Sequence, residues 1–493
     1  MGGKKQPFVV GSVLYDGVRR RPPLLSCAAV LLPLSSSLII QHSILLMSER
    51  GSFGTKIGVI LATAGSAVGL GNIWRFPYLT GQDGGAAFLL VYLVSILILG
   101  IPGMIAEFIV GRHGASNAAR AYYQLGGRWW SLIGYMGAVT SMIILGFYAV
   151  VAGWCLQYLV VSVLGGIHGD PAYVAAYFKS FSSDPVMPLL WTVAFIVLTH
   201  LVVIRGVRKG IEKFSNMLMP TLFILLLVIV VASCLLPGAG KGIAFLFKPD
   251  FSKINSNVLL DALGQSFFSL SLGTACLCTY ASYFSRQTNL SKSALQIAGI
   301  DTLIAVLAGL MIFPAAFSVG VRPDSGPSLI FITLPNVFQQ ALSPVLGYII
   351  SVLFYALLAL AALTSTISMH EIGTAMFYEE LHISRKKGAV METLLCVIIG
   401  VLSSLSCGAA DISLFGKTFL ECCDYLTSNI LLPLGSFFTC ILIGWVVPKR
   451  VVNDEFTNWG TLRARFYSVW LFTIRFVSPV CILAVFLHQL GIL

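Results

Sequence analysis

Long apolar runs alternate with short polar stretches along nearly the whole chain. A helix needs about 20 consecutive apolar residues to cross the hydrocarbon core of a bilayer. The runs that reach or approach this length lie at about 55–80, 86–111, 131–164, 188–205, 215–236, 257–285, 294–320, 344–378, 389–407, 413–446 and 467–490. The pattern predicts an all-α polytopic membrane protein with about eleven transmembrane helices.

The first predicted helix carries residues that a membrane helix usually excludes. Its stretch "GSAVGLGNIWRFP", residues 65–77, contains three glycines, an asparagine, an arginine and a proline. Unpaired backbone groups cost several kcal/mol each in hydrocarbon, so this break indicates a function. The sixth helix is interrupted in a similar way at "GQSFFSLSLGTA", residues 264–275. Breaks in helices one and six predict a 5+5 inverted repeat, residues 55–236 and 257–446, with a binding site near the bilayer midplane.

A broken helix exposes backbone N–H groups at one end and carbonyls at the other, which favours an anion site beside a cation site. Gly65, Gly69 and Gly71 allow the chain to unwind. Asn72 adds a side-chain oxygen suited to a hard cation such as sodium. Helix packing through Gly65 and Gly69 is the alternative interpretation, but it leaves Asn72 and Arg75 unexplained.

Composition and charge support a membrane protein. Hydrophobic residues make up 57% of the chain and charged residues only 10%, against about 25% charged residues in ordinary soluble domains. The net charge of +11 reflects basic residues concentrated in alternate loops, so no nucleic-acid partner is expected. The richer set of loops carries Arg112, Arg120, Arg128, Arg205, Arg208, Lys209, Lys213, Arg286, Lys292, Arg385 to Lys387, Lys449, Arg450, Arg463 and Arg465. The poorer set carries mainly Lys179, Lys241, Lys248, Lys253, Arg322 and Lys417. The positive-inside rule then predicts a multi-pass protein of the cell (inner) membrane with a cytoplasmic N-terminus.

Residues 1–46 form a leader with the basic stretch "VRRRPPLL" and an apolar run. Three interpretations stay open: a signal-like segment, an additional span, or upstream sequence translated from a mis-assigned start. We favour Met47 as the start, because a twelfth span would disturb the charge alternation. The functional domain is then 47–493.

Several ordered motifs carry a resemblance to a known family. They are "GSAVGLGNIWRFPYLTGQDGGAAFLLVY", "RGVRKGIEKFSNMLMP", "GQSFFSLSLG" with "TYASYF", "ALTSTIS" and "CDYLTSNILLPLG". In this order they resemble the neurotransmitter:sodium symporter family, whose bacterial members share the leucine-transporter fold. The resemblance covers essentially everything after Met47 and implies a sodium-coupled symporter, not an enzyme.

The resemblance implies two sodium sites. The first would use the Ala67 carbonyl, the side chains of Asn72, Ser269 and Asp301, and the substrate carboxylate. The second would use the carbonyls of Gly65, Val68 and Ala361 with the hydroxyls of Thr364 and Ser365. Back-bonding of these hydroxyls to their own helix is the alternative for Thr364 and Ser365.

Asp301 is a mid-span carboxylate, which is costly unless paired and therefore indicates a functional site. Some relatives have asparagine at this position and bind chloride near the positions that match Tyr92, Gln265 and Ser269. Asp301 supplies a negative charge itself, while Ala305 one turn later has no polar group. We therefore predict that chloride is not required; a purely structural carboxylate is the alternative.

Gly69 bears on the substrate class. Relatives that carry amines without a carboxylate place an aspartate where this chain has Gly69. Because Gly69 provides no carboxylate, the substrate is expected to be an amino acid that brings its own. This carboxylate would meet the N–H groups of Leu70 and Gly71 and the Tyr148 hydroxyl. The ammonium group of the substrate would face the carbonyls of Ala67, Phe268 and Ser269, and Ser271. Ordinary packing is the alternative for Tyr148.

The resemblance places Ile144, Phe268, Thr274, Ser365 and Met369 around the substrate side chain. Most of these residues are apolar, and Thr274 stands where the leucine-type transporter has phenylalanine, with Gly146 nearby. We therefore expect a neutral, hydrophobic or aromatic amino acid, although a methylene or ring changes affinity by only about 1–3 kcal/mol.

Two gates follow from the resemblance. Arg75 and Asp424 resemble the outer charge pair, with Tyr148 and Phe268 as an aromatic lid; a snorkelling anchor is the alternative for Arg75. The residues that resemble the inner network are Arg50, Phe53, Tyr283 and Glu379, and Phe53 departs from the usual tryptophan.

Other functions remain as alternatives. A sodium-coupled transporter of an amine or osmolyte fits Gly69 less well, and an amino-acid sensor would be expected to carry an output domain. The expected partners are the amino acid and the lipid bilayer, and a homodimer stays open.

Overall fold

A computed structural model describes residues 53–166, 171–320, 329–410, 412–463 and 465–492. The predicted leader, Arg50 and Arg322 lie outside the described residues. Eight helices in the described part of the chain are long and apolar enough to cross a membrane, and two bent pairs raise this number to ten. A further broken pair, α12 and α13, brings the total to the predicted eleven.

The spans of the first half are α2 (Lys56–Ala67) with η1 (Gly71–Arg75) and α3 (Phe76–Gln82), α4 (Ala86–Ser95) with η2 (Ile96–Gly100) and α5 (Ile101–Gly114), α7 (Arg128–Val163), α9 (Met187–Val203), and η3 (Val207–Glu212) with α10 (Lys213–Cys234). Those of the second half are α12 (Ser256–Ser269) with α13 (Cys276–Ala281), α14 (Leu290–Ser318), α16 (Pro344–Glu380), α17 (Arg385–Leu405), and α18 (Phe419–Tyr425) with η6 (Leu426–Leu431), α19 (Leu432–Ile441) and η7 (Leu442–Val446). The last span is α21 (Tyr467–Phe472) with η8 (Thr473–Val477) and α22 (Ser478–Gln489).

Short elements connect the spans. They are α6 (Ala118–Gly126), α8 (Pro171–Ser182), α11 (Ala239–Phe247), η4 (Phe251–Lys253), η5 (Leu329–Thr333), α15 (Leu334–Ala341), α20 (Lys449–Phe456), and a hairpin of β1 (Ser413–Leu414) and β2 (Lys417–Thr418).

The hairpin corrects the predicted start of the tenth span. We expected a helix from residue 413, but Ser413 pairs with Thr418 and Leu414 with Lys417. The two turn residues, Phe415 and Gly416, both have positive φ, which is the backbone that a tight two-residue hairpin requires. The apolar pair Leu414 and Phe415 had extended the hydrophobic run into this turn.

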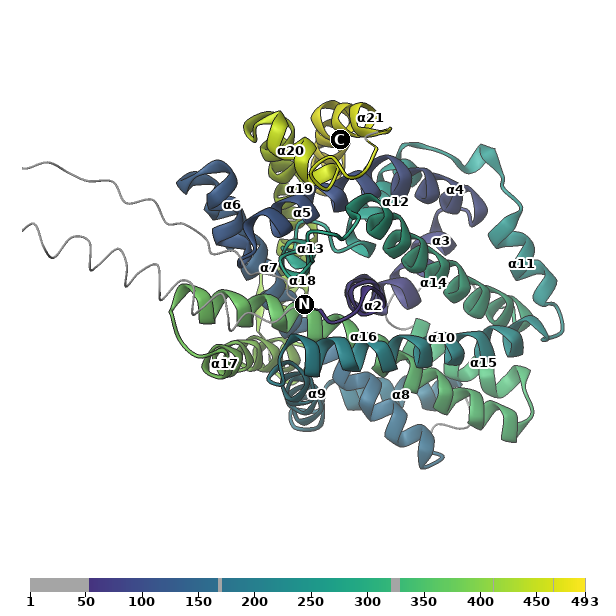
Figure 1. The fold of residues 1–493 in the computed structure, drawn as a ribbon. Coiled ribbons are helices and arrows are strands. Elements are labelled where there is room, and N and C mark those ends of the chain that lie inside the picture. Colours follow the sequence, from purple (N-terminus) through teal and green to yellow (C-terminus); the bar gives the residue numbers. More distant parts are fainter. Residues whose placement is uncertain (1–52, 167–170, 321–328, 411, 464, 493) are drawn as a thin grey trace, which may run out of the picture. The chain divides into compact units, whose positions relative to one another are not determined.

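The broken first span lies in the middle of the helix bundle (Figure 1). Helix α2 contacts α10, α14 and α16. Its N-cap is Thr55, whose side chain accepts a hydrogen bond from the Gly58 N–H, so a residue with a strong N-cap preference precedes the helix start. The path then bends by 54° between α2 and the following η1–α3 segment. This bend places the break among buried helices rather than at the lipid-facing surface.

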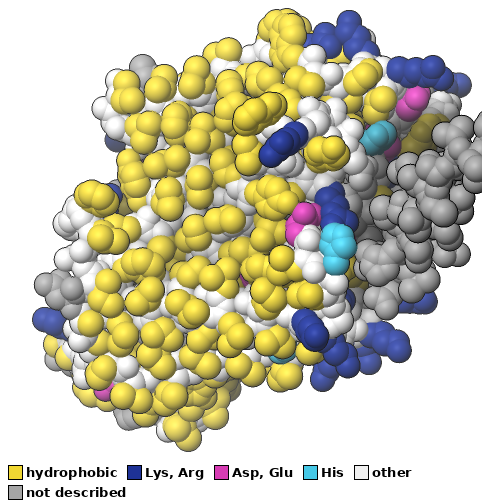
Figure 2. All heavy atoms as spheres, turned by 90° about the vertical axis from the view of Figure 1, so that its left-hand side faces the viewer, with side chains coloured by type: hydrophobic (Ala, Val, Ile, Leu, Met, Phe, Trp, Pro, Cys, Tyr) yellow, Lys and Arg dark blue, Asp and Glu magenta, His cyan; other side chains and the backbone are white. Residues whose placement is uncertain are grey.

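The outer surface suits a lipid environment. Figure 2 shows a face covered mostly by hydrophobic side chains, with most of its visible lysines and arginines toward one edge. Leu97, Ile224, Val231 and Leu394 are examples of large apolar residues that are more than half exposed on the spans. An apolar surface of this extent indicates contact with a membrane.

Candidate functional site at the two helix breaks

The first break is capped by a side chain within it. Helix α2 ends at Ala67, and Val68 adopts an extended conformation. The Gly69 N–H donates a hydrogen bond to Asn72 Oδ1 at 3.1 Å. Asn72 therefore satisfies one of the N–H groups that the break frees.

The second break contains three residues with left-handed backbone: Ser271 (φ +54°), Gly273 (φ +80°) and Ala275 (φ +60°). Glu107 of α5 accepts a hydrogen bond from the Gly273 N–H at 2.7 Å. The Ser141 hydroxyl of α7 donates to the Thr274 carbonyl at 2.7 Å. Neighbouring spans thus hold a backbone that two of these residue types rarely adopt.

Four polar side chains meet between the two breaks. Asn72 Nδ2 donates to Asp301 Oδ1 at 2.7 Å and to Ser269 Oγ at 3.2 Å. Ser269 Oγ donates to Asp301 Oδ2 at 2.7 Å, and the Tyr92 hydroxyl lies 3.4 Å from the same oxygen. All four residues are at most 2% exposed. The structure thus brings together the three side chains expected at the first sodium site, and Ala67 ends the neighbouring half-helix.

Gln265 lies one helical turn before Ser269 on α12, so both side chains project from the same face. Its amide is buried, and neither amide atom has a hydrogen-bond partner in the described part of the chain. A buried amide without partners is costly, which indicates room for water or an ion. Gln265 is one of the three residues that the family resemblance placed near the chloride of some relatives.

The second group of oxygens lies where α16 passes the first break. The Thr364 hydroxyl donates to the Val68 carbonyl at 3.2 Å and to the Ala361 carbonyl at 2.9 Å. The Ser365 hydroxyl donates to the same Val68 carbonyl at 3.1 Å. Thr364 therefore makes both the back-bond of the alternative interpretation and a contact across helices. Gly65 lies nearby, since a Cβ there would be 3.4 Å from Thr364 Cβ.

Gly69 faces two hydroxyl groups at close range. A Cβ at this position would lie 2.4 Å from Ser365 Oγ and 3.0 Å from the Tyr148 hydroxyl oxygen. The Leu70 N–H donates to the same Tyr148 hydroxyl at 3.0 Å. A Cβ at Gly71 would lie 2.8 Å from the Phe268 ring. The break thus admits no side chain at Gly69 without displacement of Ser365.

An apolar cluster lies beside the break. Ile144, Tyr148, Phe268 and Met369, four residues expected near the substrate, belong to it together with Phe147. These five residues come from α7, α12 and α16, so three spans contribute them to one apolar surface.

Thr274 and Gly146 each have a structural role beside the site. The Thr274 hydroxyl donates to the Ser271 carbonyl at 2.7 Å and accepts from the Cys276 N–H at 3.2 Å, so it stabilises the second break. The Ser271 hydroxyl in turn donates to the Ser66 carbonyl at 3.1 Å. A Cβ at Gly146 would lie 2.4 Å from Ile399 of α17. Gly146 therefore permits close packing of α7 against α17.

A cavity leads from the first break to the end of α18. Tyr148, Phe268, Arg75 and Asp424 all line it. The Arg75 guanidinium carbon lies 4.1 Å from the centroid of the Phe268 ring. Within the described ranges Arg75 and Asp424 form no ion pair; Asp424 is exposed and accepts a hydrogen bond from Ser428 at 2.9 Å. The expected outer pair thus shares a cavity without direct contact.

The opposite end of the site contains a buried carboxylate that the sequence analysis missed. The Tyr283 hydroxyl donates to Glu371 Oε1 at 2.6 Å, and Arg385 donates to the same oxygen at 2.8 Å. The Phe53 ring packs edge-on against Tyr280 and Tyr283. Glu371 is fully buried. A carboxylate within the apolar run "STISMHEIGTAMF" was the signal that would have identified it.

Glu379 lies two turns further along α16. It accepts hydrogen bonds from the Asn117 N–H at 2.7 Å and from the Tyr378 hydroxyl at 2.8 Å. Its expected partner Arg50 lies outside the described residues. The role of Glu379 in the inner network therefore stays a prediction.

Glu212 is a second residue that the sequence analysis missed. Its carboxylate accepts hydrogen bonds from the Gly54 N–H at 2.7 Å, the Thr55 N–H at 3.0 Å and the Thr55 hydroxyl at 2.8 Å. A Cβ at Gly58 would lie 2.2 Å from the Glu212 carboxylate. Glu212 thus anchors the start of the broken first span to the start of the fifth.

Comparison with known proteins identifies the family. The model of the sodium:neurotransmitter symporter family matches residues 50–167 and 182–492. An uncharacterized sodium-dependent transporter of Bacillus subtilis, YhdH, is 40% identical over 455 residues, which cover 91% of this chain and 100% of that protein. An uncharacterized sodium-dependent transporter of Haemophilus influenzae is 32% identical over 456 residues, which cover 90% and 98%.

A crystal structure of MhsT in complex with L-phenylalanine matches with a TM-score of 0.82 and 40% identity, over 89% of this chain and 100% of that one. This likeness confirms the predicted fold class, and the names of the relatives agree with a transporter rather than an enzyme. The chain therefore belongs to the sodium:neurotransmitter symporter family and is a sodium-dependent membrane transporter.

Proposed function

We propose that the protein imports a neutral, hydrophobic or aromatic amino acid together with sodium, by alternating access. The observation that carries this proposal is the packing at Gly69. A Cβ there would lie 2.4 Å from Ser365 Oγ, so the protein presents no carboxylate to a substrate amine at this point. A substrate that brings its own carboxylate completes the site.

The substrate carboxylate would lie against the first break. The Leu70 N–H and the Tyr148 hydroxyl already meet there at 3.0 Å, and Gly71 adds a further N–H. Hydrogen-bond donors at the start of a half-helix favour a negative group. The same carboxylate would be a ligand of the first sodium ion.

Two sodium ions are the proposed co-substrates. The first would take oxygens of Asn72, Ser269, Asp301 and the Ala67 carbonyl. Asp301 accepts hydrogen bonds of 2.7 Å from Asn72 Nδ2 and Ser269 Oγ, so the three side chains lie together, which supports a shared ion site. Asp301 supplies a charge inside the site, which supports independence from chloride.

The second ion would take the carbonyls of Gly65, Val68 and Ala361 and the hydroxyls of Thr364 and Ser365. Both hydroxyls already lie within 3.2 Å of the Val68 carbonyl. Hydroxyl and carbonyl oxygens suit a hard cation. Two sodium ions that cross about 100 mV release roughly 4.6 kcal/mol before any concentration gradient.

An apolar substrate side chain is supported by the cluster around Ile144, Phe268 and Met369. The members of this cluster are apolar or aromatic, and the Arg75 guanidinium lies 4.1 Å from the Phe268 ring centroid. MhsT, a relative at 40% identity, was crystallised in complex with L-phenylalanine, which supports a hydrophobic or aromatic substrate here.

Import requires that the site opens to opposite sides in turn. The cavity from Tyr148 to Asp424 supports access from the end that we assign to the exterior. The bonds among Tyr283, Glu371 and Arg385 support closure at the opposite end. The concentration of basic residues toward one edge (Figure 2) supports a cytoplasmic N-terminus.

Uptake into proteoliposomes tests the proposal. Vesicles that contain the full chain would be supplied with the twenty amino acids as a labelled mixture, under an inward sodium gradient, and each amino acid would then compete in turn. We expect sodium-dependent uptake that aromatic and large aliphatic amino acids inhibit most. An Asp301→Ala variant is the matched control and should lose this uptake. Lack of sodium-dependent uptake of every amino acid would overturn the proposal.

A further inference from the structure

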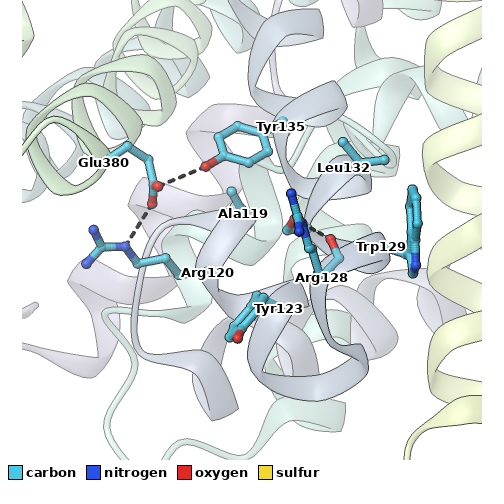
Figure 3. Close-up of a pocket in the computed structure, with 9 residues that line it drawn as sticks. Ala119, Arg120, Tyr123, Arg128, Trp129, Leu132, Tyr135 and Glu380 are labelled. Carbon is cyan, nitrogen blue, oxygen red and sulfur yellow. Dashed lines mark hydrogen bonds and ion pairs between the residues drawn. The ribbon is translucent and has the colours of Figure 1, made fainter.

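A second concave site lies at the basic end of the helices, away from the helix breaks. It is formed by α6, the first turns of α7 and the last residue of α16 (Figure 3). Arg120, Tyr123, Arg128, Trp129, Leu132 and Glu380 are among its lining residues. We refer to this site as the interfacial pocket.

The carboxylate of the interfacial pocket is already neutralised. Glu380 Oε1 accepts hydrogen bonds from Arg120 Nε at 2.8 Å and from Asn117 at 2.8 Å. Its other oxygen accepts from the Tyr135 hydroxyl at 2.8 Å. Arg128, by contrast, is exposed and makes no ion pair within the described ranges. The pocket therefore carries a surplus positive charge.

The apolar rim of the pocket suits the boundary between lipid chains and headgroups. Trp129 is 81% exposed, and Tyr123 and Leu132 are each 55% exposed. Exposed tryptophan and tyrosine at the end of a membrane helix are typical of the interface. Figure 3 shows Arg128 and Trp129 on neighbouring positions at the start of α7, with Leu132 one turn further along the helix.

We propose that the interfacial pocket binds the headgroup of an anionic phospholipid. The phosphodiester would lie between Arg128 and Arg120, because a guanidinium group matches the geometry of phosphate oxygens. The acyl chains would lie along Leu132 and Trp129. A soluble anion would use the two arginines but would gain nothing from this apolar rim, so the combination favours a lipid.

Arg120 connects the interfacial pocket to the inner end of the transporter. Arg120 also donates to the backbone carbonyl of Glu379, the residue next to Glu380. A headgroup that draws Arg120 toward itself would loosen this contact between α6 and α16. Anionic lipid would thereby change the rate at which the inner end opens, whatever the amino-acid substrate is.

Quenching of Trp129 fluorescence tests binding without any need for transport. The full chain would be placed in nanodiscs of neutral phosphatidylcholine that contain either brominated phosphatidylglycerol or brominated phosphatidylcholine at equal mole fraction. The difference between the protein and its Trp129→Phe variant isolates the Trp129 signal. We expect the anionic lipid to occupy the site about five-fold more strongly, since an arginine near the surface contributes about that factor.

Variants of single arginines decide the outcome. Arg128→Gln should abolish the preference, Arg128→Lys should keep part of it, and Arg463→Gln, an exposed arginine outside the pocket, should keep all of it. Equal quenching by both lipids, or a preference that survives Arg128→Gln, would overturn the proposal. Loss of the preference in Arg463→Gln would indicate general surface charge instead, and displacement by inorganic phosphate would indicate a soluble anion; either result also overturns it. Equal melting temperatures of the variants would verify folding.

Discussion

The packing at Gly69 allows one substitution to be predicted in detail. In Gly69→Ala, the new methyl group would lie 2.4 Å from Ser365 Oγ and 3.0 Å from the Tyr148 hydroxyl. Both distances are shorter than van der Waals contact. The hydroxyl must therefore rotate away from the Val68 carbonyl, which it now contacts at 3.1 Å.

Two terms set the size of the effect. Overpacking of a well-packed site costs about 1–3 kcal/mol, and the lost hydrogen bond adds about 1 kcal/mol. If Ser365 is a ligand of the second sodium ion, the rotated hydroxyl no longer reaches that ion, so the loss of this contact weakens the sodium-bound form specifically. At about 1.4 kcal/mol per ten-fold change, sodium affinity should fall at least ten-fold.

The midpoint of sodium-dependent thermal stabilisation measures this change, because an ion that binds only the folded protein raises its stability with concentration. Melting would be followed while sodium replaces choline at constant ionic strength. Gly240→Ala, in α11, is the control, because α11 contributes no proposed sodium ligand. Its methyl would meet no atom within 4 Å. It should keep the sodium midpoint of the unmodified protein and gain up to about 1 kcal/mol from helix propensity.

The variant pair Ser365→Ala and Gly69→Ala/Ser365→Ala separates packing from ligand loss. The double variant removes the clash, so its melting temperature in choline should recover relative to Gly69→Ala. Its sodium midpoint should stay high, because the hydroxyl ligand is still missing. The reasoning is refuted if Gly69→Ala binds sodium as the unmodified protein does, or if the double variant regains normal sodium affinity.

Three further predictions follow from the described contacts. Asp301→Asn should lower sodium affinity at least ten-fold in gluconate. It should also make uptake chloride-dependent, since the buried Gln265 amide has no hydrogen-bond partner in the described part of the chain and could meet a chloride ion. Uptake with and without chloride checks this, and a chloride response equal to that of the unmodified protein contradicts it. Glu212→Ala should lower the free energy of unfolding by about 2 kcal/mol or more, because Gly54 and Thr55 lose their shared acceptor. Thermal melting measures this loss, with Lys213→Ala as the control variant. Equal melting temperatures of the two variants would refute the anchoring role of Glu212. Burial, with the charge of Asp261 nearby, raises the pKa of Asp83 in the α3–α4 loop to about 6. The contribution of Asp83 to stability is therefore present below about pH 4 and is lost as the pH rises through 6. Asp83→Asn should make the melting temperature change less between pH 5 and pH 7, and a melting profile parallel to that of the unmodified protein would count against this.

The sequence predicted the two breaks because glycines together with polar residues, such as Asn72 in the first break and Gln265 in the second, are unusual within an apolar run. It located the first break within a few residues of its position between Ala67 and Gly71. The backbone of the second break was less accessible to prediction. Ser271 and Ala275 adopt positive φ, which neither residue type favours. Contacts from other spans, such as Glu107 to Gly273, stabilise that conformation, and such contacts leave no local pattern in the sequence.

The difference between Gly69 and Glu371 shows which functional residues a sequence reveals. Gly69 was found because the family motif around it is local, so a missing side chain is visible by its position alone. The structure then changed the physical reason: the space beside Gly69 is filled by Ser365 and Tyr148, so the position excludes an aspartate by packing as well as by composition. Glu371 has no such motif. Its partners Tyr283 and Arg385 come from positions 88 and 14 residues away in sequence. A buried carboxylate signals that a partner must exist, but only the fold identifies the partner.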